Sequence, residues 1–361
     1  MKIGKVPENV LKRSVLRQIK TKRKEVISGA GVGEDCAIFS FTDNMPLFTC
    51  MQEAVLWPDG DTAERGSSWD SPAIKPGQLI QKCANNLAAG GGRMIAAMIT
   101  LLLPEETEET YIKAFMSEAE AKCTELKVQI AGGQTRISNA VRMPVASVTG
   151  YGVPFEKNGE PRAGRRAVGQ QTVNKCGIGK PRLGQDVVIS KWIGLEGTAI
   201  LAKKNREKLL DRYPAYLVDE AACFERFLSV IPEAATAVKS GVCAMHDASE
   251  GGVFGALWEL AEGAGVGLTI DLKKLPLRQE TVEICECCNV NPYELLSGGC
   301  LVMTTEDGPG LVAALESEDI PAVIVGKVTD SNDRIIVNED EVRYMDRPKQ
   351  DEIYRISAER Q

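Results

Sequence analysis

His246-Asp-Ala-Ser-Glu-Gly-Gly252 is the stretch from which the fold can be inferred, and it contains the only histidine of the chain. Val242 and Ala244 lead into it as a short buried strand. Apolar residues then recur at helical spacing, at Val253, Leu257, Leu260 and Ala261. The pattern predicts a strand, a polar turn, a Gly-Gly pair and a helix, in that order.

The polar turn has two interpretations. Free backbone N–H groups at a helix start, together with glycines that let the main chain approach closely, form a seat for an anion such as a phosphate. Ser249 and Asp247 are also ordinary N-cap residues. The same residues therefore also fit a capped helix whose histidine only packs, and spacing alone leaves both interpretations open.

The stretch resembles the His-Asp-x-[Thr/Ser]-Glu-Gly-Gly signature of the aminoimidazole ribonucleotide synthetase superfamily. This superfamily includes the hydrogenase maturation factor HypE, thiamine-monophosphate kinase and selenophosphate synthetase, and the HypE-like branch is the most similar. The sequence that follows also fits, at Glu259-Leu-Ala-Glu262, Gly265-Val-Gly267, Leu275-Pro276, Asn291-Pro292, Ser297-Gly-Gly299 and Val325-Gly-Lys-Val-Thr329.

The resemblance implies an α/β (α+β) fold with two domains. We expect an N-terminal domain at 1–153, whose mixed sheet forms a barrel with its twin in a homodimer, and a C-terminal α/β domain at 181–346. A basic linker or flap at 154–180 joins them, and a polar, frayed tail follows at 347–361. The resemblance also implies that ATP lies between the domains with magnesium on its phosphates, and that the protein phosphorylates or adenylates a small acceptor.

A glycine-rich loop, Gly29-Ala-Gly-Val-Gly-Glu-Asp-Cys-Ala-Ile-Phe39, carries a second resemblance. It is not a Walker loop because no Gly-Lys-[Ser/Thr] follows, but it is similar to the family's Gly-x-Gly-[Asp/Glu]-Asp-Ala-Ala-Val loop. The resemblance implies that Gly31 and Gly33 lie near phosphates and that Glu34 and Asp35 hold magnesium. Paired carboxylates suit such a hard, oxygen-seeking cation.

The resemblance assigns further residues to the site. Nucleotide or phosphate contacts are expected from Asn85, Gly132, Gly133, Ser249, Gly251 and Gly252. Asp247 and His246 are the candidate catalytic residues. A histidine is attractive as a general base because its ordinary pKa lies near neutrality, although a histidine just before a helix also fits a structural role.

Three positions depart from the family pattern. Met51, Asn86 and Gln134 stand where relatives carry aspartates, in Thr-Thr-Asp, Asn-Asp and Gly-Gly-Asp-Thr motifs. Because phosphoryl transfer depends on metal-held charge neutralisation, these changes weaken the expected magnesium site. The last cysteine is Cys300, so the reaction that HypE proteins carry out on a cysteine near their C-terminus is not expected here.

Several functions fit these features. The first is a HypE-like, ATP-dependent enzyme of phosphotransferase or ligase type that acts on an unknown small acceptor, with a maturation protein as a possible partner. The alternative is a catalytically degenerate homodimer that binds a nucleotide, a phosphometabolite or a partner protein. In a third interpretation, the motifs persist only as structural elements of an α/β dimer.

Composition narrows the class of protein. A chain of 361 residues with 43% hydrophobic and 26% charged residues is typical of a soluble protein with two domains. A net charge of −7 and a pI near 5.2 argue against nucleic-acid binding. No apolar run approaches the roughly 20 residues of a membrane span, and no secretory signal is recognisable, so we expect a cytoplasmic protein.

The eleven cysteines are expected to be reduced thiols rather than a disulfide framework. Cys285, Cys287 and Cys288 cluster, but they lie on a predicted helix without a second group of ligands. We therefore expect no zinc.

Periodicity places the remaining elements. Helices are expected at 7–20, from Pro76 onward, and at 105–127, 197–202, 221–228 and 280–289. Strands are expected at 46–55, 94–103, 128–131, 141–150, 181–190, 267–271, 301–304 and 323–328.

Overall fold

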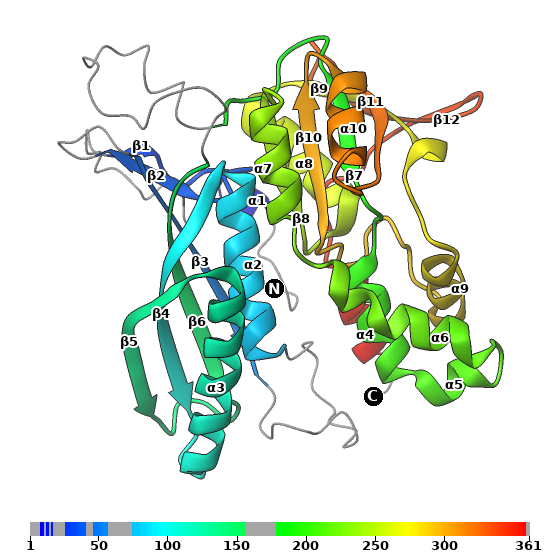
Figure 1. Cartoon of the computed structure of the whole chain (residues 1–361). Coiled ribbons are helices and arrows are strands. Elements are labelled where there is room, and N and C mark those ends of the chain that lie inside the picture. The colour runs from blue at the N-terminus through cyan, green and yellow to red at the C-terminus, as the bar shows by residue number, and fades with distance from the viewer. Residues whose placement is uncertain are drawn as a thin grey trace.

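A computed structural model of the chain describes residues 8–10, 12–13, 16, 26–40, 46–56, 74–155 and 178–358. These residues form two domains, each built on its own sheet (Figure 1). Most of the predicted basic segment at 154–180 lies outside the described residues, as does most of the helix expected at 7–20, of which α1 (Glu8–Val10) is described.

The N-terminal domain contains a six-stranded mixed sheet, as expected. Its strands follow the order β1 (Val26–Ser28), β2 (Ala37–Ser40), β3 (Pro46–Val55), β6 (Val145–Pro154), β4 (Gly92–Leu103) and β5 (Gln129–Ile137). Only the pairing of β4 with β5 is parallel. Helices α2 (Pro76–Ala89) and α3 (Glu109–Leu126) cover one face (Figure 1), where Phe48, Leu79 and Phe115 belong to the core.

The other face of this sheet is exposed. The apolar sequence of β4 is typical of a strand buried on both faces, but its side chains alternate, so that Leu101 is buried whereas Met98 is 43% exposed. The strand register places Met51, Thr149 and Met98 in one row on this face, and Met51 is 66% exposed. An apolar strand pattern does not show which face of a sheet is covered.

The C-terminal domain contains a seven-stranded sheet. The strand order is β13 (Glu341–Tyr344), β12 (Arg334–Asn338), β9 (Gly267–Asp271), β11 (Ala322–Thr329), β7 (Asp186–Ser190), β10 (Cys300–Thr305) and β8 (Ala244–Ala248). Helix α8 (Gly252–Ala264) packs on one face, while α7 (Ile231–Lys239) and α10 (Gly308–Glu316) pack on the other.

A smaller group of helices packs beside this sheet. It comprises α4 (Leu195–Lys204), α5 (Arg206–Leu210), α6 (Ala215–Ala222), the 3-10 helix η4 (Cys223–Phe227) and α9 (Gln279–Cys288). A 3-10 helix, η5 (Leu272–Lys274), follows β9. The helix predicted at 221–228 corresponds to the end of α6, at Ala222, and to the 3-10 helix η4 that follows it. Among the described residues, no helix is both long and apolar enough to cross a membrane.

Most predicted elements are confirmed, with shifted ends. The predicted strands at 46–55 and 267–271 coincide with β3 and β9. Helix α3 begins at Glu109 rather than at 105, and β5 continues through the Gly-Gly pair as far as Ile137.

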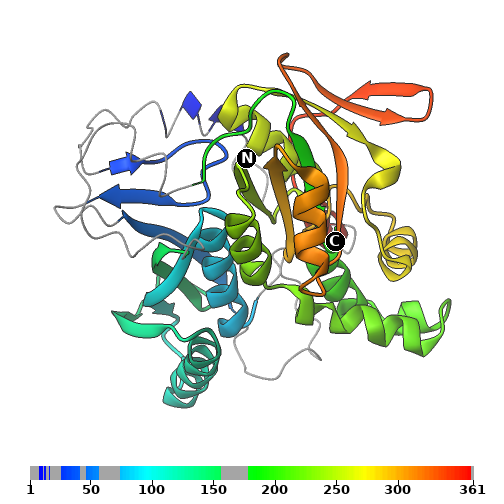
Figure 2. The ribbon, with the colours of Figure 1, turned by 45° about the horizontal axis from the view of Figure 1, so that its top comes forward.

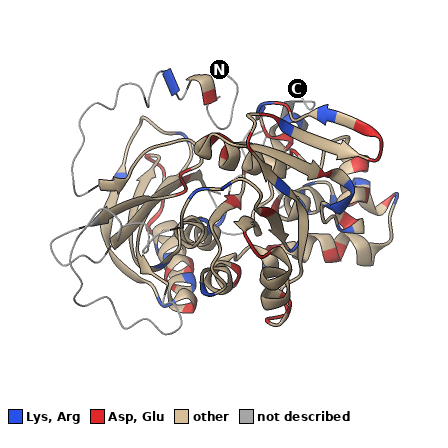
Figure 3. Cartoon of the chain, turned by 90° about the horizontal axis from the view of Figure 1, so that it is seen from above, with Lys and Arg blue, Asp and Glu red and all other residues tan. Residues whose placement is uncertain are grey.

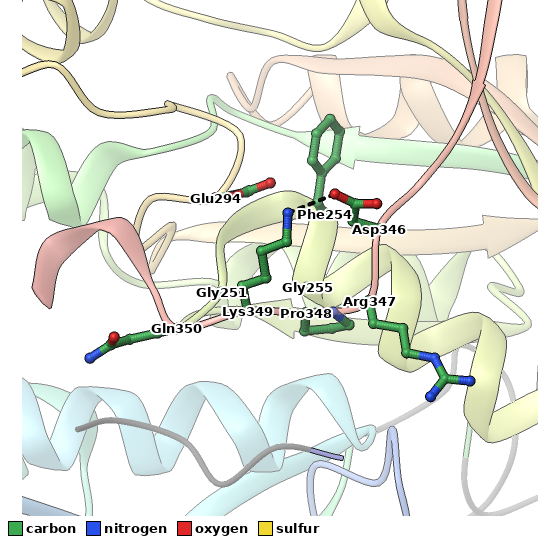
Figure 4. A pocket seen from close by; sticks show the side chains of 9 residues that line it. All are labelled: Gly251, Phe254, Gly255, Glu294, Asp346, Arg347, Pro348, Lys349 and Gln350. Atoms are coloured by element: carbon green, nitrogen blue, oxygen red, sulfur yellow. Dashed lines mark hydrogen bonds and ion pairs between the residues drawn. The ribbon is translucent and has the colours of Figure 1, made fainter. Parts of the chain in front are cut away.

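The segment after Asp346 differs from the frayed tail that its polarity predicted. It continues into α11 (Glu352–Ala358), and Asp351 is buried. Asp351 Oδ2 accepts a hydrogen bond from the Gly251 N–H at 2.6 Å, while Oδ1 accepts from Leu296 and Ile353 at 3.2 and 2.9 Å. Figure 4 shows residues 346–350 lying along the start of α8.

Replacing Asp351 should destabilise the C-terminal domain. Asp351→Ala leaves three N–H donors without their acceptor, two of them buried and one half-buried, so we expect the free energy of unfolding to fall by about 3 kcal/mol. Asp346→Ala is the matched control, because Asp346 is exposed and pairs with the exposed Lys349, and it should change the value by less than about 0.5 kcal/mol. Equal effects of the two variants in denaturant unfolding would contradict the structural role of Asp351.

Candidate functional site

Helix α2 joins the two domains. It lies beside α7 in both ribbon views (Figures 1 and 2), and its Ala88 and Ala89 belong to the same apolar core as Met245 and Leu301 of the C-terminal sheet. Helix α2 of the N-terminal domain therefore packs directly against the C-terminal domain, and we call this contact the junction.

Asn85, a predicted nucleotide contact, forms hydrogen bonds across this junction. Its Nδ2 donates to the Leu228 carbonyl at 2.7 Å, and its Oδ1 accepts from the Val230 N–H at 3.1 Å and from Gln81 at 2.9 Å. The buried amide is thus engaged with the backbone of the C-terminal domain. Its role toward a nucleotide stays a prediction.

His246 lies in β8, not in a turn, and is held between two carboxylates. Its Nδ1 is 2.8 Å from Asp35 Oδ2, and its Nε2 is 3.1 Å from Glu259 Oε2 on α8. Asp35 Oδ2 also accepts from the Asp247 N–H at 3.3 Å. The predicted metal ligand Asp35 and the predicted catalytic pair, His246 and Asp247, therefore come together across the domain boundary.

The surroundings change the chemistry of His246. The side chain is buried, which disfavours its charged form, but Asp35 and then Glu259 outweigh this effect and raise the pKa of His246 to about 10. At neutral pH the imidazole is protonated and paired. The two carboxylates, which the sequence alone could not show, move the pKa of His246 away from neutrality, and its role as a catalytic base stays a prediction.

The glycine-rich loop packs against α8. Gly33 has a φ of +76°, and a Cβ at this position would lie 2.4 Å from the Glu259 carbonyl oxygen. A larger residue is therefore excluded by the backbone of α8. Gly31 lies beside Glu34, whose carboxylate is exposed and accepts from Ser28 Oγ at 3.0 Å.

The predicted anion seat at the start of α8 holds the chain's own carboxylate. The N-cap is Gly251, with a φ of +92°, rather than Ser249 or Asp247. Gly251 donates its N–H to Asp351, and Gly252 donates to the Ser249 carbonyl at 3.1 Å. A phosphate at Gly251 would have to displace Asp351.

Other predicted residues lie apart from this junction. Gly132, Gly133 and Gln134 are on β5, which forms one edge of the N-terminal sheet, whereas the loop with Asp35 adjoins β2 near the other edge. Met51 is on the exposed face of β3, and only Asn86, on α2, lies near the junction. Within one chain, the sheet order therefore separates Gly132, Gly133 and Gln134 from the loop that carries Asp35.

A small pocket lies between α2 and the C-terminal domain. Its polar lining consists of Gln78, Gln81, Lys82 and Asn85 from α2, with Glu196, Asp247 and Ser249 from the other side. Lys82 Nζ pairs with Glu196 Oε1 at 2.8 Å. Burial and then the nearby Asp35 raise the pKa of Asp247 well above its usual range.

Sequence reasoning missed Lys82, Glu196 and Asp351. The only available signal for Lys82 is its spacing of three from Asn85, which places both on one face of α2. Glu196 and Asp351 carry no local signal, because their partners lie on distant segments.

The expected ligands do not form a magnesium site by themselves. Asp35 is engaged with His246, and no group of three or more His, Cys, Asp or Glu side chains in the described part of the chain could hold a metal ion. Cys285 and Cys288 are buried in the core between α9 and its neighbours, and burial raises the pKa of Cys285 to about 12.

The raised pKa of His246 makes stability dependent on pH. Because the folded-state pKa lies above the ordinary value of 6.5, the charged imidazole contributes fully below about pH 6.5 and its contribution is lost toward about pH 10. His246→Gln should lower the free energy of unfolding by about 3–5 kcal/mol at pH 6.5, and this difference should shrink by more than half at pH 9.5.

Denaturant unfolding at several pH values measures this difference. Lys349→Gln, which removes an exposed ion pair, is the control and should stay within about 0.5 kcal/mol of the wild type at each pH. A His246→Gln difference that is constant with pH would show that the histidine is uncharged in the folded state.

Two family models match the chain. The model of the AIR synthase related protein N-terminal domain matches residues 33–153, and that of the C-terminal domain matches residues 182–338. Each match falls on one of the two sheets.

Relatives match over most of the chain. A protein of Methanocaldococcus jannaschii that is named for hydrogenase expression/formation is 24% identical over 344 residues, which are 92% of this chain and 91% of that protein. Carbamoyl dehydratase HypE of Rhodobacter capsulatus is 27% identical over 266 residues, which are 71% of this chain and 72% of that protein.

Solved structures share the fold. HypE in complex with ATP matches with a TM-score of 0.65 at 15% identity, over 96% of both chains. A HypE–HypF complex matches with a TM-score of 0.65 at 18% identity, over 88% of this chain and 94% of that chain. The chain belongs, through both of its domains, to the AIR synthase related protein family, and its fold is that of HypE.

Proposed function

We propose that this protein binds ATP at the junction of its two domains and uses it to activate a small acceptor, as a HypE-like protein. The meeting of the two family motifs carries the proposal. Asp35 from the glycine-rich loop contacts both His246 and the N–H of Asp247, 212 positions away in the sequence. The similarity to HypE proteins, one of them solved with ATP, supports the same conclusion.

The residues at the junction have different roles in this proposal. The ion pairs of His246 hold the loop with Asp35 against β8 and α8, so that nucleotide and acceptor meet a fixed surface. Asp247 and Lys82 line the adjoining pocket and are the candidates to contact the acceptor. Magnesium enters only as the ion that accompanies ATP, since the described residues offer no preformed group of ligands.

A homodimer and a maturation partner belong to the same proposal. Strands β3 to β6 carry only three charged residues, Glu53, Arg93 and Arg136. Figure 3 shows few charges on these strands and charges of both signs over the C-terminal domain. A second copy would cover the exposed apolar row of Met51 and Met98. The solved HypE–HypF complex motivates a maturation protein as a further partner.

Calorimetric titration of ATP, with and without magnesium, tests nucleotide binding. We expect magnesium-dependent binding by the wild type and binding at least about 10-fold weaker in Asp35→Asn, which is about 1.4 kcal/mol. The isosteric amide keeps the shape of Asp35 but removes its charge. Glu306→Gln, an exposed carboxylate far from the junction, is the control and should bind like the wild type.

Absence of binding at millimolar ATP in both conditions would overturn this function. The alternative, a degenerate binding protein in which Met51, Asn86 and Gln134 replace the family's carboxylates, would then stand. Binding that is unaffected in Asp35→Asn would instead move the nucleotide away from the junction.

The molar mass of the protein in solution tests the proposed dimer. Met98→Glu places a charge in the middle of the proposed contact and should convert the dimer to a monomer in light scattering coupled to gel filtration. Leu183→Glu changes an exposed apolar residue on the C-terminal domain and should leave the mass unchanged. A monomeric wild type, or a dimer in both variants, would exclude this face as the contact.

A further inference from the structure

The pocket between α2 and the C-terminal domain contains two buried carboxylate oxygens without partners. Glu196 is 2% exposed and Asp247 is 5% exposed, and both line the pocket. Glu196 Oε1 pairs with Lys82, but Glu196 Oε2 and Asp247 Oδ1 have no hydrogen-bond partner among the described residues. Buried acceptors of this kind are costly unless a donor satisfies them.

The charges around the pocket leave a surplus of negative charge. Asp35, Glu259, Glu196 and Asp247 provide four carboxylates, whereas His246 and Lys82 provide two cations. The two cations are already engaged, His246 with Asp35 and Glu259, and Lys82 with Glu196. Burial and Asp35 favour the neutral form of Asp247, so a cation bound beside it would supply the positive charge that its ionised form lacks, whereas a bare phosphate would be repelled.

We propose that this pocket binds the acceptor through a positively charged nitrogen that carries hydrogen atoms, such as a primary ammonium group, with Asp247 Oδ1 and Glu196 Oε2 as its hydrogen-bond acceptors. The inference rests on the proposed function, because it places the acceptor of that reaction beside Asp35. Such a group supplies both the missing donors and the missing charge. An ammonium group suits the narrow space, which Gly298 closes on the side of Glu196.

Lys82 has a second role in this arrangement. It holds one oxygen of Glu196, so the carboxylate keeps a fixed orientation with its other oxygen available for the ligand. Gln78, Gln81 and Asn85 lie on the same face of α2, and the amides of Gln81 and Asn85 are bonded to each other. The side of the pocket formed by α2 is therefore ordered without a ligand.

The probe for this site is methylammonium, titrated in the absence of nucleotide at pH 8 and constant ionic strength and followed by chemical-shift changes of backbone amides. We expect saturable shifts that include the amides of residues 82, 196 and 247. Tetramethylammonium has the charge but no N–H donor, and it should give no saturable response. Potassium chloride is titrated in the same way, and a weaker response to potassium than to methylammonium distinguishes an ammonium site from a general cation site.

Asp247→Asn is the test variant, since it keeps the shape of the side chain while removing its charge and breaks no ion pair of Asp247. We expect binding of methylammonium to weaken at least about 5-fold, whereas the exposed control Glu306→Gln should bind like the wild type. Glu196→Gln should weaken binding as well, and the dispersion of the amide spectrum reports whether each variant is folded.

Three results would overturn the proposal. They are an equal response to potassium, saturation by tetramethylammonium, or unchanged binding in Asp247→Asn. Because the titration contains no nucleotide, its failure is distinguishable from failure of ATP binding, which the calorimetry measures by itself. Binding of methylammonium without any ATP binding would leave an amine site on a protein of another function.

Discussion

The charged imidazole of His246 is the interaction on which the junction of the two domains depends. It is buried, and its charge is tolerated only because Asp35 from one domain and Glu259 from the other are both within ion-pair distance. Taking either carboxylate away would leave the buried imidazolium with a single ion-pair partner. The domains are therefore held at one relative position by an electrostatic requirement as well as by the apolar contacts of α2.

Helix α2 connects this requirement to the chemistry of the site. Its alanines pack into the core of the C-terminal domain, its Asn85 bonds to the backbone around Leu228, and its Lys82 orients Glu196. One helix of the N-terminal domain thus forms one side of a pocket whose other side belongs to the C-terminal domain. Such an arrangement couples the geometry of the pocket to the packing of the domains.

Local patterns allowed much of the fold to be predicted, and non-local contacts explain the rest. The apolar spacing after Gly252 predicts α8 because a helix depends on near neighbours in the sequence. The partners of His246 could not be predicted, because Asp35 approaches it only after the domains pack. The same holds for Lys82 with Glu196, and for the exposed face of β4, whose covering depends on other elements. The resemblance to a family identified His246 and Asp247 as site residues, but the charge states of these two side chains depend on neighbours that the sequence does not show.

The hydrogen bonds of Asp351 have a consequence for local unfolding. The first turn of α8 depends on a residue 100 positions later in the chain, and the same carboxylate also binds the N–H groups of Leu296 and Ile353. These three amides cannot lose their acceptor separately, because one side chain serves all of them. The start of α8, the loop before β10 and the start of α11 therefore form one cooperative unit, in which amide protons exchange with solvent together.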